Sequence, residues 1–421
     1  MRRSNIGPGI IGCIALIALC LGLFLLSSRH RAAPVIPRDV DNRPIPVRPA
    51  DVDDRLVSAD NRFAIKLFDQ MAGKQPIQNI FISPFSISAA LAMTYAGAAG
   101  TTQKGMSNAL ELQGIGTSDV GKGNLALAHA LTSADPKVKI EIANSLWAKE
   151  GVSFQPKFVS GAQKYYDAKV SGLAGAPATI NNWVEQKTHD KIRDLIARLD
   201  PSTVLVLVNA IYFKGEWTTK FDKSKTTNED FHLPASGTKA VPMMWQEDGH
   251  QYFMGDDFEA LKLPYGNRSM SMYFFLPDKH SSLMEFYKQL TVQNWDKWMS
   301  SFHETDVPIG IPRFKVEWGG DPDGILNQPL IAMGMGEAFA SNADFMNMAL
   351  FRPLYVDKVV HKASMQVDEE GTTAAAAPPV LMTKGGRGMR MPMLIDRPFF
   401  CAIRDDRTGE ILFMGSIADP K

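Results

Sequence analysis

The chain has 421 residues, of which 45% are hydrophobic, and its 45 basic and 45 acidic side chains balance. This apolar content suffices for one large hydrophobic core or two medium ones, while the neutral balance gives no indication of the basic face typical of nucleic-acid binders. The three cysteines (Cys13, Cys20 and Cys401) exclude a disulfide framework, so packing must hold the fold together.

The N-terminus carries a membrane signal. After Arg2 and Arg3, an apolar run extends from about residue 6 to 26 and ends before a basic cluster at 29–31. Roughly 20 apolar residues match the thickness of a bilayer core and exceed the usual core of a signal peptide. We expect residues 1–32 to form an uncleaved signal anchor, with a cleaved signal peptide as the alternative. The arginine pair favours a cytoplasmic N-terminus, which would put the rest of the chain outside the cytoplasm.

The next segment, residues 33–56, contains several prolines and mixed charges without periodicity, which predicts an extended linker. From residue 57 to 421 the composition is globular, and no internal repeat is evident. Helical spacing of apolar residues predicts a helix over 58–71. A short apolar strand at 80–82 follows, and Ser83-Pro84 then opens another helix, since proline is tolerated in a first turn.

Three further apolar runs, at 204–208, 270–276 and 411–414, predict strands buried on both faces. Helical patterns dominate the first half of the chain and strand patterns the second. This order predicts an α+β fold with a large mixed sheet.

Catalytic and metal-binding motifs are absent: the sequence lacks G-x-S-x-G, H-E-x-x-H and C-x-x-C. Residues 116–122 match the first seven letters of a P-loop, but Gly123 stands where the Mg²⁺-binding hydroxyl is required, so we expect an ordinary Gly/Ser loop. The histidines lack metal-ligand spacing, and His303-Glu304 is predicted to lie in a surface loop. We therefore expect neither an enzyme nor a cofactor.

One segment, 368–379 (DEEGTTAAAAPP), has an unusual position. Its composition is that of a flexible linker, yet strand patterns at 361–367 and 399–403 enclose it. A long unstructured stretch inside a compact domain demands a functional reason. In an extended conformation Thr372, Ala374 and Ala376 would point the same way. Such small residues allow the segment to stay exposed and still enter a sheet without steric hindrance.

Eight segments, in order along the chain, resemble motifs of the serpin family over about residues 57–420. They are NIFISPFSISAALAM from Asn79, NAIYFKGEW from Asn209, VPMM from Val241, KLPY from Lys262, ADF from Ala343, the 368–377 segment, and DRPFF from Asp396 with LFMG from Leu412. The resemblance implies the serpin fold: a large mixed central sheet (sheet A) with further sheets, eight or nine helices, and an exposed reactive-centre loop at about 369–396.

The resemblance also assigns roles to particular residues. Under the centre of sheet A, the shutter would comprise Ser83, Ser86, Asn209 and His361. At the point where the loop enters the sheet, the breach would comprise Trp217, Arg313 and Glu369, the last two as a salt bridge or, alternatively, as two unrelated surface charges. The hinge would comprise Glu369, Glu370, Gly371, Thr372, Thr373, Ala374, Ala375, Ala376 and Ala377.

The resemblance implies an inhibitor that traps a serine or cysteine protease in a covalent complex while its cleaved loop inserts into sheet A. The chain departs from the usual hinge at Pro378-Pro379, where each proline would remove a ladder hydrogen bond from the inserted strand. A non-inhibitory, membrane-tethered serpin, acting as a binding module or as a plain protease substrate, is therefore the alternative.

The scissile bond depends on how the hinge length is counted. Lys384 is our first choice and Arg387 the second, because both suit a trypsin-like target; the commonest hinge length gives Gly385 instead, which suits a small primary pocket. The region that matches the basic stripe of cofactor-assisted serpins, 115–137, holds only Lys122 and Lys137. We therefore expect no heparin-like activator, and we expect a monomer.

Overall fold

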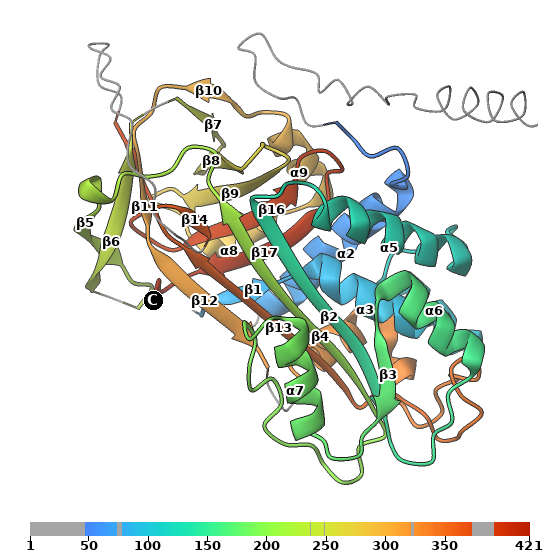
Figure 1. Cartoon of the computed structure of the whole chain (residues 1–421). Coiled ribbons are helices and arrows are strands. Elements are labelled where there is room, and N and C mark those ends of the chain that lie inside the picture. Colours follow the sequence, from blue (N-terminus) through green and yellow to red (C-terminus); the bar gives the residue numbers. More distant parts are fainter. Residues whose placement is uncertain (1–46, 74–77, 236, 248, 321–323, 373–390) are drawn as a thin grey trace, which may run out of the picture. The chain divides into compact units, whose positions relative to one another are not determined.

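The computed structural model describes residues 47–73, 78–235, 237–247, 249–320, 324–372 and 391–421. Within these ranges the chain forms three β-sheets with helices packed around them (Figure 1). Helices gather in the first half of the chain and strands in the second, so the predicted α+β class is confirmed.

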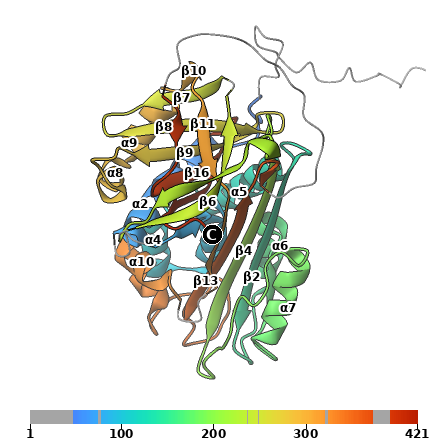
Figure 2. The same cartoon turned by 90° about the vertical axis from the view of Figure 1, so that its left-hand side faces the viewer.

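The six-stranded sheet, called sheet A below, is the predicted mixed sheet. Its strands follow the order β12-β13-β4-β2-β3, and the short β14 pairs with β4. The β13–β4 and β2–β3 pairs are parallel, whereas the others are antiparallel. Figure 2 shows β13, β4 and β2 side by side. The bounds are β12 (Phe314–Gly319), β13 (Lys358–Val367), β4 (Leu205–Glu216), β2 (Val138–Ala148), β3 (Lys169–Gly172) and β14 (Gly371–Thr372).

Strand β4 is buried on both faces, as its apolar run predicted. Leu205 and Leu207 belong to the core that contains α2 and α3, whereas Val206 and Val208 belong to a separate core beneath α7 (Ala178–Lys187). The period-2 alternation of a strand divides the side chains between these two layers. Sheet A is therefore enclosed between helices, and any additional strand would have to enter within its plane.

The C-terminal part of the chain contributes strands to both of the other sheets. The seven-stranded sheet runs β1 (Ile80–Ile82), β17 (Ile411–Ile417), β16 (Phe399–Asp405), β9 (Met270–Pro277), β8 (Phe258–Tyr265), β7 (His250–Met254) and β10 (His303–Thr305). The four-stranded sheet runs β15 (Met393–Leu394), β11 (Ile309–Pro312), β6 (Thr238–Gln246) and β5 (Thr227–His232). The predicted strands at 80–82, 270–276 and 411–414 are thus confirmed.

The helix predicted over 58–71 is present but longer: it begins at Asp54, inside the predicted linker 33–56, whereas the helix opened by Ser83-Pro84 begins as predicted. The Asp53 side chain accepts a hydrogen bond from the Arg55 amide at the start of α2 (Asp54–Ala72). Ser83 caps α3 (Pro84–Gly97), whose proline lies in the first turn. The remaining helices and helical turns are α4 (Gly100–Ala109), α5 (Thr117–Thr132), α6 (Pro156–Tyr166), α8 (Leu283–Gln289), α9 (Val292–Met299), α10 (Asn327–Leu330), η1 (Lys223–Lys225), η2 (Ile331–Met335) and η3 (Gly336–Phe339).

Two local expectations were wrong. The P-loop-like segment is not a Gly/Ser loop: Gly116 is the N-cap of α5, which continues through Lys122 because Val120, Leu127 and Leu131 bury one side of it. His303 and Glu304 lie in strand β10, paired with β7, although both remain exposed. In each case tertiary packing overrides a weak local preference.

The predicted membrane anchor lies in residues 1–32, outside the described part of the chain. Among the residues that the structure describes, none of the helices combines the length and apolar character needed to span a bilayer.

Candidate functional site

The candidate site lies where β13 and β4 meet and then separate. The two strands pair directly at seven positions, from Lys358 opposite Val206 to Ser364 opposite Tyr212. Past this point β13 continues to Val367, the chain reverses, and Gly371 and Thr372 pair antiparallel with Glu216 and Gly215 of β4. The centre of sheet A is therefore closed, whereas at the end of β4 the two-residue strand β14 lies on the edge of β4 that faces β13 (Figure 1).

The reversal is a tight turn over 368–371. The Asp368 amide donates to the Gly371 carbonyl at 2.8 Å, and the Gly371 amide donates back to the Asp368 carbonyl at 3.1 Å. Gly371 has φ +143°, and a Cβ there would lie 2.1 Å from the Gly215 carbonyl oxygen. Only glycine fits this conformation and this approach to β4.

Trp217 fixes the turn from the side of β4. Its indole Nε1 donates to the Asp368 carbonyl at 2.9 Å, and its amide donates to the Glu370 carbonyl at 2.9 Å. The ring stacks on Tyr265 with centroids 4.5 Å apart. Phe221 adds a third bond, from its amide to the Glu369 carbonyl at 2.9 Å. The segment after β4 thus holds three consecutive carbonyls of the turn.

Arg313 and Glu369 form an ion pair, so they are not two unrelated surface charges. The Glu369 side chain is only 2% exposed and also accepts a hydrogen bond from Thr226 Oγ1 at 2.7 Å. Burial opposes its ionisation, but the hydrogen bonds from Arg313 and Thr226 together lower the pKa of the Glu369 carboxyl. The Glu369 carboxylate is therefore ionised, and both of these hydrogen bonds fall on its Oε1.

A second carboxylate of the turn binds two lysines that sequence reasoning missed. Glu370 accepts from Lys220 Nζ at 2.7 Å and lies 3.0 Å from Lys223 Nζ. The hydrogen bond from Lys220, joined by one from Lys223, lowers the pKa of Glu370 against the effect of partial burial. The two lysines follow Trp217 by three and six residues, which is the one signal that could have placed them near the hinge.

The four shutter residues come together beneath the middle of sheet A. His361 lies opposite Asn209 across the β13–β4 pair, and its Nδ1 is 2.6 Å from Asn209 Oδ1. Asn209 Nδ2 donates to Ser86 Oγ at 2.6 Å, and Ser83 Oγ donates to the Leu412 carbonyl at 2.6 Å. All four residues are buried. The network therefore connects both central strands of sheet A to α3 and to β17.

Asn144 is a further member of this network that sequence reasoning missed. Its Oδ1 accepts from Asn209 Nδ2 at 2.7 Å, because the register of β2 puts the two asparagines directly opposite each other. Strand register is not readable from one sequence, so no local signal identified it.

The shutter histidine is neutral. Its Nε2 accepts a hydrogen bond from the Ser83 amide at 3.2 Å, so the proton resides on Nδ1, which donates to Asn209. Complete burial lowers the pKa of His361 to about 3. Protonation would turn Nε2 into a donor facing the Ser83 N–H, so the network holds only the uncharged ring.

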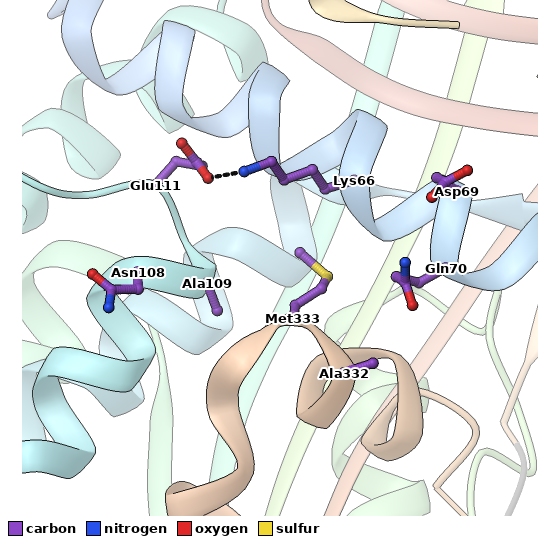
Figure 3. Close-up of a pocket in the computed structure, with 8 residues that line it drawn as sticks. All are labelled: Lys66, Asp69, Gln70, Asn108, Ala109, Glu111, Ala332 and Met333. Carbon is purple, nitrogen blue, oxygen red and sulfur yellow. Dashed lines mark hydrogen bonds and ion pairs between the residues drawn. The ribbon is translucent and has the colours of Figure 1, made fainter. Parts of the chain in front are cut away.

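A separate pocket of about 240 Å³ lies between α2, the end of α4 and η2 (Figure 3). Its charged lining includes Lys66, which is already paired with Glu111. Hinge and shutter residues do not line this pocket. In the ranges that the structure describes, groups of three or more His, Cys, Asp or Glu able to hold a metal ion are also absent.

The rest of the predicted loop lies outside the described residues. This applies to Thr373, to the alanines of the hinge (Ala374, Ala375, Ala376 and Ala377), to Pro378-Pro379, and to the scissile-bond candidates Lys384, Gly385 and Arg387.

Comparison with known proteins identifies the fold just described. The family model for serpins, described as serine protease inhibitors, matches residues 58–420. The chain belongs to the serpin family. The leukocyte elastase inhibitor of Bos taurus is 35% identical over an alignment of 382 residues that covers 87% of this chain and all of that protein. An uncharacterized serpin-like protein of Thermococcus kodakarensis is also 35% identical, over 87% of this chain and 86% of that protein.

Solved serpin structures agree with this assignment. The native state of tengpin, a thermophilic serpin, superposes with a TM-score of 0.80 at 30% identity, covering 90% of this chain and 97% of that one. Human thyroxine-binding globulin in complex with thyroxine superposes with a TM-score of 0.80 at 29% identity, covering 87% and 98%.

Proposed function

We propose that this serpin is a suicide substrate that inhibits a serine or cysteine endopeptidase and is not itself an enzyme. The protease nucleophile attacks a carbonyl carbon in the loop, the amine of the next residue leaves, and an ester or thioester joins the two proteins. The freed end of the loop then inserts into sheet A as a new strand. Insertion drags the protease with it and distorts its active site before water hydrolyses the acyl bond.

The state of sheet A carries this proposal. β13 and β4 pair directly through the shutter, so the central position of the sheet is still available to a new strand. Gly371 and Thr372 already have the antiparallel pairing with β4 that such a strand would continue. An inhibitor that acts by insertion must begin in this uninserted state.

The energy of insertion is large enough for the mechanism. A new strand separates the seven residue pairs between β13 and β4 and replaces them with one ladder on each side. For about ten inserted residues at roughly 1 kcal/mol per net hydrogen bond, the gain is on the order of 10 kcal/mol. An acyl-enzyme needs sub-ångström placement for hydrolysis, so this energy suffices to disable it. Pro378 and Pro379 each remove roughly 1–3 kcal/mol, which slows or shortens insertion without reversing it.

The direct test is incubation with trypsin followed by denaturing electrophoresis. We expect a covalent band at the summed mass, and a gain in melting temperature once the loop of the free serpin is cut. Production of cleaved serpin alone, with an unchanged melting temperature, would contradict inhibition by insertion.

Replacing Pro378 and Pro379 with Thr and Val should lower the number of serpin molecules consumed per protease molecule.

The class of target protease follows from the scissile bond. Cleavage after Lys384, our first choice, or after Arg387, our second, favours a protease with an acidic primary pocket. The mammalian relatives are named as inhibitors of leukocyte elastase, and a small primary pocket would instead select Gly385. Mass spectrometry of the cleaved loop after incubation with trypsin or elastase decides between these sites.

A second candidate is a binding module that does not trap proteases, which the double proline favours. Thyroxine-binding globulin supports it, because that neighbour has the same fold and is solved with bound thyroxine. In this case cleavage of the loop would leave thermal stability unchanged.

We also propose that the serpin is a monomer tethered outside the cytoplasm by residues 1–32. The support is the apolar run and its flanking arginines in the sequence. Recovery of the full-length protein in the membrane fraction, accessible to added protease only from the extracytoplasmic side, is the expected result. A mature N-terminus after residue 32 would indicate a cleaved signal peptide and a secreted protein.

A further inference from the structure

We propose that Lys220 and Lys223 are positioning residues for loop insertion, because they hold Glu370 and thereby keep the turn 368–371 in the reversed conformation from which the inserted strand continues. The inference deepens the proposed inhibitory function and rests on it for its consequence, but the clamp itself can be tested without a protease. The name "Glu370 clamp" is used below for Glu370 with these two lysines.

The geometry of the clamp connects the turn to the end of β4. Lys220 Nζ lies 2.7 Å from Glu370 and 3.5 Å from Glu216, the last residue of β4. Lys223 approaches the other oxygen of Glu370 at 3.0 Å from the helical turn η1. The Glu370 side chain is 6% exposed, and each of its two oxygens binds one ammonium group, while the lysine side chains themselves remain partly exposed.

The clamp acts on the same peptide groups that define the reversal. The Glu370 amide donates to Asp368 Oδ1 at 3.0 Å, and the Glu370 carbonyl accepts from the Trp217 amide. Holding the side chain of Glu370 therefore fixes the residue that precedes Gly371, the first residue of β14. The turn makes the chain run opposite to β13, as the antiparallel pairing of β14 with β4 shows. Because β13 and β4 run parallel, a strand that enters between them in this direction is antiparallel to both.

The consequence is kinetic. Insertion competes with hydrolysis of the acyl-enzyme, and a turn that already has its final direction leaves only strand propagation to be completed. If Glu370 were not held, the turn would adopt other conformations, and the reversed conformation would have to form again before each insertion. The clamp therefore favours trapping over release of an active protease and a cleaved serpin.

The test compares three variants of the full chain. Lys220→Gln with Lys223→Gln removes both cations, Lys220→Arg with Lys223→Arg retains them, and Lys225→Gln is the matched control, since Lys225 pairs with Glu247 outside the clamp. Hydrogen exchange at the amides of Trp217 and Phe221, which donate to the turn, reports the clamp in the intact protein. We expect roughly three- to tenfold faster exchange in the double glutamine variant and wild-type exchange in the other two.

The same variants are then incubated with a protease that the wild type traps. The double glutamine variant should consume severalfold more serpin per protease molecule trapped, and the arginine variant should behave as the wild type. Unchanged exchange at Trp217 and Phe221 would overturn the inference, and so would more efficient trapping, because the clamp would then restrain insertion. If the wild type traps no protease, the proposed function fails, but the exchange result still decides whether the clamp exists.

Discussion

The shutter and the hinge both link other segments of the chain to β13 and β4. The shutter does so with neutral side chains and the hinge with charged ones. In the shutter, Asn209 and His361 are uncharged, buried, and bonded to each other across the two strands. In the hinge, Glu369 and Glu370 are charged and bind cations that remain partly in water, with Lys223 52% exposed. The two regions thus restrain the same sheet by different forces.

Because of this difference, the stability of each region should respond to a different change in conditions. A buried neutral network is insensitive to salt, but it fails when one partner is lost or protonated. Ion pairs whose cations remain partly in water are weakened by salt and contribute less than a fully buried network. The centre of the sheet is therefore held firmly, whereas the end where a strand would enter is adjustable. The following experiments test this contrast.

The largest effect is expected for Asn209→Ala. It leaves the Nδ1–H of His361 and the Oδ1 of Asn144 buried without their partner, which costs about 2–4 kcal/mol. Guanidinium denaturation of the intact protein measures the loss. Lys315→Ala, on the exposed side of edge strand β12, is the control and should change stability by less than about 0.5 kcal/mol. Equal losses in the two variants would contradict the special role of the network.

The next effect is a pH dependence carried by His361. Its pKa is about 3 in the folded protein against an ordinary value of 6.5 for histidine, so the unfolded chain binds more protons between these values. The contribution of His361 to stability is therefore complete above pH 6.5 and is lost as the pH falls toward about 3. At about pH 5 the loss is about 2 kcal/mol.

The measurement compares the wild type with His361→Gln over this pH range. Subtraction is needed because burial raises the pKa of Asp60, which lies in α2 and accepts a hydrogen bond from Ser88 of α3, to about 7, so stability from that carboxyl falls as the pH rises. The difference between the two proteins should vary with pH as stated. A difference that is constant with pH would show that His361 does not titrate in this way.

A smaller effect is expected for Arg313→Ala. The variant leaves Glu369 with Thr226 as its remaining side-chain partner and should destabilise the protein by about 1–2 kcal/mol, because the carboxylate stays buried. Removing Arg313 should also raise the pKa of Glu369, since its hydrogen bond helps to lower that pKa. Arg313→Lys retains the charge and should recover part of the stability. Recovery of none of it would mean that an ammonium group cannot replace the guanidinium at this site.

The smallest effect is the salt dependence of the clamp. Raising the ionic strength to about 1 M should remove less than about 1 kcal/mol from the contribution of Glu370, measured as the difference between the wild type and Glu370→Gln. The penalty of Asn209→Ala should be the same at both salt concentrations. If salt weakened the shutter as much as the hinge, the contrast between the two regions would be wrong.

The sequence predicted the strands and helices that carry a strong pattern. The capping Ser83 with Pro84, and the continuous apolar run of β4, specify their structure locally and were confirmed. The segment at 116–122 and the edge strand at His303 were predicted incorrectly, because packing against the rest of the molecule decided their conformation. Local preferences are weak wherever glycine or polar residues leave several conformations close in energy.

The sequence by itself determined the family, the apolar layers of sheet A, and the identity of the residues that meet at the shutter and at the Arg313–Glu369 pair. Only the tertiary structure decided which groups complete these sites: Asn144 joins the shutter through strand register, and Lys220 and Lys223 reach Glu370 across a turn of the chain. The reason is physical. The residues of a motif are neighbours in the sequence and can be recognised there, whereas strand register and ion pairs between distant segments depend on how the whole core packs.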